Sequence, residues 1–184
     1  IYEVSEPSPF EKQTVWPSRT FTITYSDRKV NKKMHSDCEA VAVQNGTLYL
    51  LTKWRVRERG SGYPDDGTAL YQVDLPSKPD GKFSLVAKRV DERKGIGGWV
   101  TAADISPDGK TIAFAVGQSE TQANEFGLSE VEIESGIERE LTSERFFNIK
   151  HLAWLPDENG LLITASKIPN RIFRIWQIPN DGSD

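Results

Sequence analysis

The chain has 184 residues, which is long enough for one domain with a sizeable core. Hydrophobic residues make up 37% of it and charged residues 27%, and its formal net charge is −4. This acidic balance argues against a dedicated nucleic-acid binder, which usually carries a basic domain. No apolar run approaches the roughly 20 residues that a membrane-spanning helix needs, so we expect no membrane span.

Short strands separated by turn residues dominate the sequence, and helical periodicity is almost absent. Many segments alternate apolar and polar residues or are rich in β-branched and aromatic side chains, as half-buried strands are. In chain order we predict strands over residues 1–5, 19–25, 39–43, 47–53, 69–74, 83–90, 100–105, 111–116, 127–133, 138–142, 149–154, 161–166 and 172–178. Tight turns are predicted at Asn45-Gly46, Asp108-Gly109 and Asn159-Gly160, because these residue types tolerate positive φ.

The predicted strands repeat in groups. Three segments, at 39–50, 101–114 and 150–163, each read as a strand of small residues, a tight turn and an apolar strand. After each comes a variable loop and a third strand, and in the first two cases a fourth strand follows. Repeated units of four strands are typical of the blades of a propeller.

The turn sequences carry a family resemblance. The segment from Ile105 to Phe114 (ISPDGKTIAF) resembles the repeat core of TolB-like, WD40-like β-propellers. The segment from Ala153 to Asp157 (AWLPD) resembles the same core, and residues 136–142 resemble the outer strand that leads into the next blade. The resemblance implies an all-β fold, a β-propeller built of four-stranded antiparallel blades. It says little about function, because such repeats occur in many settings.

The number of strands predicts an incomplete ring. We expect one β-propeller domain over residues 1–184, with blades at 1–33 (outer strands only), 37–90, 99–142 and 148–180. Propellers typically have about four to eight blades, and this chain holds about three to four. Further blades or a second copy of the chain would complete the ring, since an uncovered strand edge invites pairing. The alternative is a small closed monomer in which the terminal strands share one blade.

The first positions of the three inner strands are candidates for a site. Glu39, Thr101 and Lys150 align there, which in a propeller places them near one mouth of the central channel, with Asp37 and Asp104 close by in sequence. We predict that these five residues bind a ligand. The carboxylates can supply part of a calcium site, which needs about six to eight oxygen ligands. Alternatively they solvate the channel entrance or accept hydrogen bonds from backbone amides between blades.

A second candidate is a basic patch. Lys53, Arg55, Arg57 and Arg59 alternate along one strand and its exit loop, which puts them on one side. The patch can bind an anion or an acidic partner, or it can be a solvated edge that discourages strand pairing. The long loops at 56–68 and 117–126 are either a binding surface or tolerated insertions.

No catalytic signature accompanies these features. The sequence lacks a Gly-x-Ser-x-Gly nucleophile elbow and a phosphate-binding loop. We therefore predict a non-enzymatic platform whose loops and channel mouth bind a protein or a small ligand. We predict no catalytic residue, no metal-binding residue and no cofactor, with a calcium ion as the alternative. The TolB-like resemblance implies a periplasmic or extracellular location. The alternatives are a calcium-dependent propeller hydrolase, similar to phytase-like or lactonase-like propellers, and the propeller domain of a larger serine peptidase.

Overall fold

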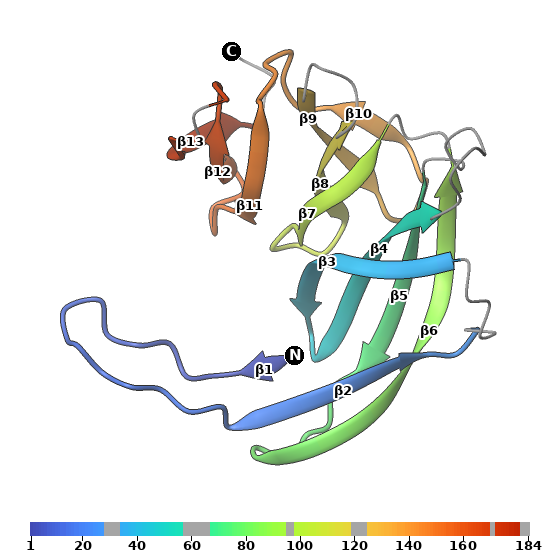
Figure 1. Cartoon of the computed structure of the whole chain (residues 1–184), viewed down its shortest axis with the longest axis vertical. Coiled ribbons are helices and arrows are strands. Elements are labelled where there is room, and N and C mark those ends of the chain that lie inside the picture. The colour runs from blue at the N-terminus through green and yellow to red at the C-terminus, as the bar shows by residue number, and fades with distance from the viewer. Residues whose placement is uncertain (28–33, 57–66, 95–97, 119–124, 170–171, 181–184) are drawn as a thin grey trace.

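Figure 1 shows a computed structural model of the chain, which describes residues 1–27, 34–56, 67–94, 98–118, 125–169 and 172–180. These residues form thirteen strands and no helix, so the described part of the chain contains no helix that could cross a membrane. The strands lie in three separate sheets. The all-β fold class predicted from the sequence is confirmed.

The first sheet contains six strands in the order β1–β2–β6–β5–β4–β3. They are β1 (Tyr2–Glu3), β2 (Arg19–Tyr25), β3 (Met34–Gln44), β4 (Thr47–Val56), β5 (Gly67–Asp74) and β6 (Gly81–Lys94). The second sheet has the order β10–β9–β8–β7 and the third the order β11–β12–β13. Their strands are β7 (Trp99–Ile105), β8 (Thr111–Gln118), β9 (Glu125–Glu132), β10 (Glu138–Glu140), β11 (Asn148–Trp154), β12 (Gly160–Ser166) and β13 (Arg174–Pro179). Every predicted strand overlaps one of these, although β3 and β6 run longer than predicted.

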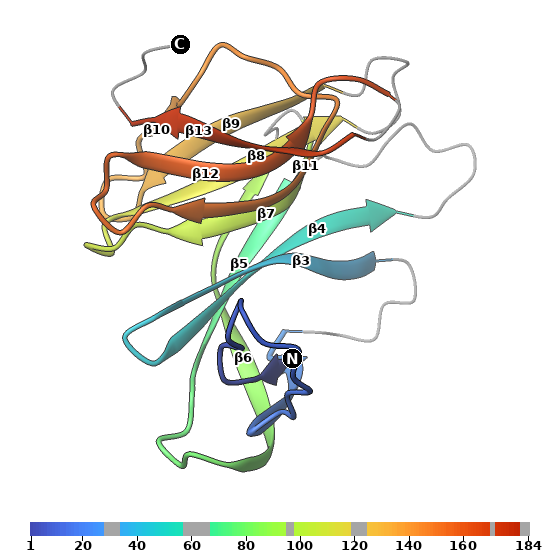
Figure 2. The same ribbon diagram turned by 90° about the vertical axis from the view of Figure 1, so that its left-hand side faces the viewer.

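The three sheets stand side by side around a common centre, as the blades of a propeller do (Figure 1, Figure 2). The inner strands are β3, β7 and β11, and β7 packs against both of the others. The second sheet therefore lies between the first and the third. Together the three sheets cover an arc rather than a closed ring.

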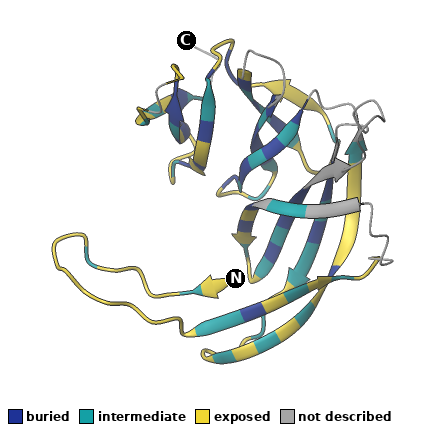
Figure 3. Cartoon of the chain, in the orientation of Figure 1, coloured by how far each residue is buried: buried dark blue, intermediate teal, exposed yellow. Residues whose placement is uncertain are grey.

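Apolar side chains from both neighbours fill each space between sheets (Figure 3). Between the first and second sheets the buried residues are Ala40, Ala42, Leu51, Val100, Ala103, Ile105, Ile112 and Phe114. Between the second and third sheets they include Ala102, Leu128, Phe146, Ile149, Leu152, Trp154 and Ile163. Small residues on β3 and β7 let the inner strands approach closely. Ala153 on β11 is exposed, because none of the described sheets packs on that face.

The first sheet curls over its own outer face. We expected residues 1–33 to supply the outer strands of a separate blade, but β2 instead pairs in parallel with β6 and extends the first sheet. Ile23 and Tyr25 of β2 then pack on a cluster formed by Leu48, Leu50, Ala69, Tyr71 and Ala87. Leu50 and Leu51 are successive residues of β4 and point to opposite faces, so this cluster lies on the face away from the second sheet. The curl covers apolar surface that a preceding blade would otherwise cover.

A polar network fastens the end of β2 to this sheet. The Tyr71 hydroxyl donates to Asp27 Oδ1 at 3.1 Å, and Arg89 Nε lies 2.9 Å from Asp27 Oδ2. Burial and the neighbouring Asp27 carboxylate raise the pKa of Tyr71 from 10.0 to about 12. The pKa of Tyr71 is thus higher in the folded state than in the unfolded chain. The stability contributed by the neutral Tyr71 hydroxyl and its hydrogen bond to Asp27 is therefore fully present below pH 10, and it is lost as the pH rises through about 12.

The variant Tyr71→Phe tests this network. We expect the difference in tyrosinate absorbance between the wild type and the variant to titrate with a midpoint near pH 12. The reason is that Asp27 and burial both oppose the phenolate of Tyr71. A midpoint near 10 would show that the hydroxyl is solvated and that the network does not form.

The structure confirms two of the three predicted hairpin turns. Asn45 and Gly46 have φ values of 48° and 78°, and Gly109 has a φ of 77°. The third turn is longer than predicted, and its left-handed residue is Glu158, with a φ of 61°. Gly160 instead begins β12.

Candidate ligand-binding site

The three aligned residues Glu39, Thr101 and Lys150 occupy equivalent places in their blades. Each is the extra residue of a β-bulge in an inner strand. The pairing register passes directly from Cys38 to Ala40 in β3, from Val100 to Ala102 in β7 and from Ile149 to His151 in β11. A bulge leaves one residue unpaired and bends the strand, so it gives all three inner strands the same local curvature.

The side chains at the bulges have different surroundings. The hydroxyl oxygen of Thr101 is buried and has no hydrogen-bond partner within the described ranges of the chain. The Lys150 ammonium lies 5.7 Å from the centroid of the Phe173 ring, a cation–π distance. The side chain of Glu39 lies outside the described part of the structure. The bulges therefore give these positions a shared backbone role, and their binding of a ligand stays a prediction.

Asp104 joins two blades through its carboxylate. Its Oδ1 accepts the backbone N–H of Ile105 at 2.9 Å, and its Oδ2 accepts that of Trp154 in the third blade, also at 2.9 Å. Asp104 therefore accepts a hydrogen bond from a backbone amide of the neighbouring blade, which was one of the alternatives to ligand binding in the sequence analysis. Asp37 is half-buried on β3, opposite Lys53 of β4 in the pairing register. Across the described residues, no group of three or more His, Cys, Asp or Glu side chains is placed to hold a metal ion.

We expect the variant Asp104→Ala to lose about 1–3 kcal/mol of folding free energy, because the Trp154 amide then has no acceptor. Urea denaturation of the variant and the wild type measures this loss. Asp80→Ala, at an exposed aspartate in the β5–β6 turn, is the matched control and should be nearly neutral. Equal midpoints for the two variants would show that the inter-blade bond does not stabilise the fold.

The basic patch is only partly described. Lys53 and Arg55 belong to β4 and, two residues apart, share one face of the strand. Their side chains, and all of Arg57 and Arg59, lie outside the described residues, as do most of the loops at 56–68 and 117–126. The anion-binding role of the patch stays a prediction.

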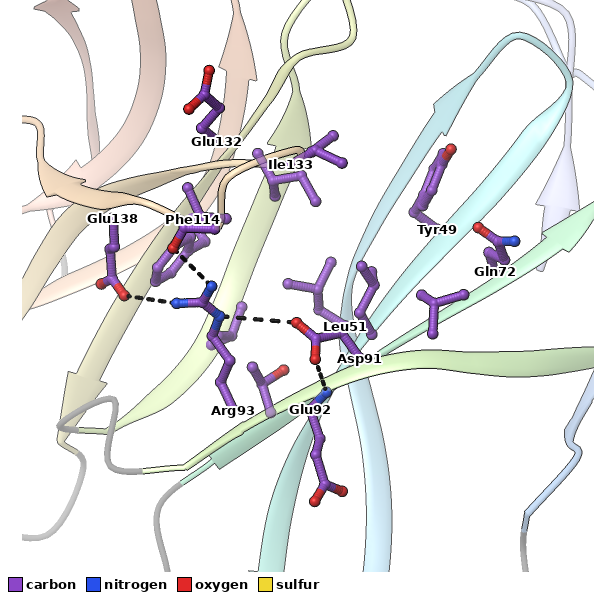
Figure 4. Close-up of a pocket in the computed structure, with 17 residues that line it drawn as sticks. Tyr49, Leu51, Gln72, Asp91, Glu92, Arg93, Phe114, Glu132, Ile133 and Glu138 are labelled. Carbon is purple, nitrogen blue, oxygen red and sulfur yellow. Dashed lines mark hydrogen bonds and ion pairs between the residues drawn. The ribbon is translucent and has the colours of Figure 1, made fainter.

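The structure shows a site that the sequence did not suggest, a groove of about 390 Å³ between the first and second blades (Figure 4). This volume lies in the usual range of small-molecule pockets, about 300–1,000 Å³. Its apolar lining includes Leu51, Leu70, Val100, Ile112, Phe114 and Val131. Strands β4, β5 and β6 form one side, and the second blade forms the other.

Arg93 crosses one part of the groove between the two blades. Its Nη2 donates to the backbone carbonyl of Gly136 at 2.9 Å, and its Nη1 lies 3.7 Å from Glu138 Oε2. Its Nε lies 4.0 Å from Asp91 Oδ2 on the first blade. Figure 4 shows the guanidinium between these two carboxylates. Arg93 therefore ties β6 to the β9–β10 turn and makes this part of the groove polar.

Thr68 is the unusual residue of the groove. It lines the groove from β5, it is only 8% exposed, and its hydroxyl oxygen has no hydrogen-bond partner in the part of the chain that the structure describes. A buried hydroxyl without a partner costs about 1–3 kcal/mol, so such groups are rare in folded proteins. The groove thus combines apolar walls with a buried hydroxyl whose hydrogen bond a ligand could supply.

Comparison with known proteins establishes the fold. No family model and no curated protein matches the chain. The chain is similar to the β-propeller domain of the Trilobed protease from Pyrococcus furiosus, described as having an open velcro topology, with a TM-score of 0.50, 18% identity, and coverage of 79% of this chain and 40% of that one. It is also similar to Pyrococcus horikoshii acylaminoacyl peptidase, with a TM-score of 0.51, 13% identity, and coverage of 80% and 24%.

A third solved structure, the putative TolB from Agrobacterium tumefaciens, has a TM-score of 0.44 and 16% identity, too low a similarity to argue from. The chain spans less than half the length of the two Pyrococcus structures. At these identities the similarity shows the fold alone. The chain therefore has the architecture of part of a β-propeller, an arc of three blades, as its repeats predicted.

Proposed function

We propose that this chain is a non-enzymatic binding platform and that the groove between its first two blades is a ligand site. The observation that supports this most strongly is the Thr68 hydroxyl, which is buried at the groove and has no hydrogen-bond partner among the described residues. A ligand whose polar group reaches Thr68 would recover the hydrogen bond, while its apolar part covers Leu70 and Ile112. The extracytoplasmic location implied by the TolB-like resemblance belongs to the same proposal.

A neutral probe tests the proposal. Titration with hexan-1-ol, followed by methyl NMR, should shift the resonances of Leu51, Ile112 and Val131 in a saturable way. The methyl groups of Ile175, on the exposed face of the third blade, serve as the internal control. Unsaturable shifts of equal size at both places would show that the groove has no preference for a ligand and would overturn the proposal.

Two matched variants sharpen this test. Thr68→Val and Thr101→Val each remove a buried hydroxyl that has no hydrogen-bond partner among the residues the structure describes, and of the two only Thr68 lines the groove. Both variants should be at least as stable as the wild type, because each removes an unsatisfied polar group. Only Thr68→Val should weaken the binding of hexan-1-ol, and an equal loss in both variants would contradict the assigned site.

The open end of the arc is the proposed place for a further partner. Within the described residues β13 pairs only with β12, whereas β6 covers β5 and β10 covers β9. Ile175 on β13 is 75% exposed, and Leu162 on β12, two residues from the Thr164 that pairs with Ile175, is also exposed. An unpaired edge with apolar side chains favours pairing with another sheet, which supports completion of the ring by further blades or by a second copy.

A second candidate function is the propeller domain of a larger peptidase. It is favoured by the printed descriptions of the two Pyrococcus structures, one a protease propeller and the other an acylaminoacyl peptidase. The sequence of the complete gene tests it directly. A hydrolase domain with a Gly-x-Ser-x-Gly elbow in the same reading frame supports this candidate, and its absence contradicts it.

The calcium-dependent alternative makes a different prediction. We expect millimolar calcium to change the melting temperature by less than about 1 °C, since a ligand stabilises only the state that binds it. The physical reason is that both carboxylate oxygens of Asp104 already accept backbone amides. A rise of several degrees that saturates at micromolar calcium would favour the hydrolase alternative instead.

A further inference from the structure

We infer that the ligand of this groove is an amphipathic cation, a primary ammonium on an alkyl chain, such as a lysine side chain presents. The inference rests on the proposed function and adds the chemical class of the ligand. It depends on the charges that line the groove, on the geometry of Arg93 and on the position of Thr68.

The charged residues of the groove are mostly acidic. Among the described lining residues, the carboxylates of Asp91 and Glu138 flank the one cationic side chain, Arg93. Glu92 and Glu132 also line the groove, but their carboxylates turn away from it, to Arg89 and to Ser135 (Figure 4). Beside apolar walls, which exclude water, such charges act more strongly on a ligand than they would in bulk solvent. A cationic ligand is therefore attracted to the groove, and an anionic ligand is repelled.

The geometry of Arg93 also favours a positively charged ligand. Among the described residues, its one contact at hydrogen-bond distance is to the Gly136 carbonyl oxygen, while Glu138 and Asp91 lie 3.7 and 4.0 Å away. Two carboxylates thus flank and neutralise this guanidinium. Because both distances exceed the roughly 2.7–3.2 Å of a hydrogen bond, Glu138 Oε2 and Asp91 Oδ2 keep acceptor capacity for a ligand, whereas Asp91 Oδ1 accepts the backbone N–H of Glu92 at 2.8 Å. An ammonium group brings three donors and no acceptor, which suits acceptors left unused.

Thr68 lies at the same polar part of the groove. In the pairing of β5 with β6, Thr68 stands directly opposite Arg93. Its hydroxyl oxygen can accept a hydrogen bond from an ammonium that also meets the carboxylates of Glu138 or Asp91. The alkyl chain then extends over Leu70, Ile112 and Val131, which line the rest of the groove.

Three probes of equal chain length separate this inference from the proposed function. Methyl NMR titrations at neutral pH compare hexylammonium, hexan-1-ol and hexanoate. We expect hexylammonium to bind at least about threefold more tightly than hexanoate at low salt, which corresponds to one favourable charge contact at a partly exposed site. Added salt should weaken hexylammonium binding and leave hexan-1-ol binding unchanged, because only the charged ligand is screened.

A pair of glutamate variants identifies the source of the preference. Glu138→Gln removes a carboxylate that lines the groove and lies 3.7 Å from Arg93 Nη1. Glu134→Gln removes an exposed carboxylate between β9 and β10 that is not among the lining residues, and it is the matched control. Only Glu138→Gln should reduce the affinity for hexylammonium, by about twofold or more, with no change for hexan-1-ol.

The outcomes distinguish the two claims. Binding of hexan-1-ol with hexanoate as tight as hexylammonium overturns the cationic assignment and leaves the groove as a ligand site. Failure of all three probes to bind at the groove overturns the proposed function and this inference together. A preference for hexylammonium that falls with salt and with Glu138→Gln supports both.

Discussion

Replacement of Phe146 by alanine should destabilise the fold by about 3–5 kcal/mol, the range for deleting a buried aromatic side chain. Phe146 is 1% exposed and lies in the core between the second and third blades. Its ring meets that of Trp176 edge-on, with centroids 5.8 Å apart. Its backbone also bridges to Phe126, with N···O distances of 2.7 and 3.0 Å. A cavity there would remove packing from both blades at once.

Chemical denaturation of Phe146→Ala and of Phe10→Ala measures this effect. Phe10 lies between β1 and β2 and is 94% exposed, so its truncation should change the free energy of unfolding by less than about 0.5 kcal/mol. Similar losses in the two variants would mean that Phe146 is not buried between blades.

The second large effect is expected at Gly160, the first residue of β12. A Cβ atom at this position would lie 2.2 Å from the backbone carbonyl oxygen of Ile178 on β13. Because the obstacle is backbone in a paired strand, it cannot rotate away as a side chain can. We expect Gly160→Ala to cost about 3 kcal/mol, the upper range for overpacking.

Gly46→Ala is the matched control for this variant. Gly46 has a φ of 78°, but a Cβ there would meet no atom within 4 Å. Its cost is then the left-handed backbone strain alone, about 1 kcal/mol. Thermal melts of the two variants compare these costs. A loss at Gly160 no greater than at Gly46 would show that β12 and β13 do not approach as closely as the structure has them.

The repeat architecture could be predicted from the sequence at the level of single residues. The alignment of Glu39, Thr101 and Lys150 came from strand and turn patterns alone, and the structure places all three at inner-strand bulges. The pattern specifies strands and turns because their residue preferences act over a few neighbours. It could not specify what the side chains at these positions meet across the ring.

Contacts between distant segments account for what the sequence did not predict. The parallel pairing of β2 with β6 depends on the curl of a sheet whose strands lie far apart in the chain. The groove is likewise lined by residues from Tyr49 to Glu138, on both of the first two blades. Thr68 carries no signal in a strand pattern, because a buried threonine without a partner looks the same in sequence as one with a partner. A site between two blades becomes visible only once their spacing is known.

Methyl NOE spectroscopy on the intact chain tests most directly whether the three sheets pack as blades around one centre. The structure predicts cross-peaks between the methyl groups of Ala42 and Ile105, across the first and second blades, and between Leu128 and Ile163, across the second and third. Cross-peaks confined to residues within each sheet would contradict the propeller arrangement, and the groove between the blades would not exist.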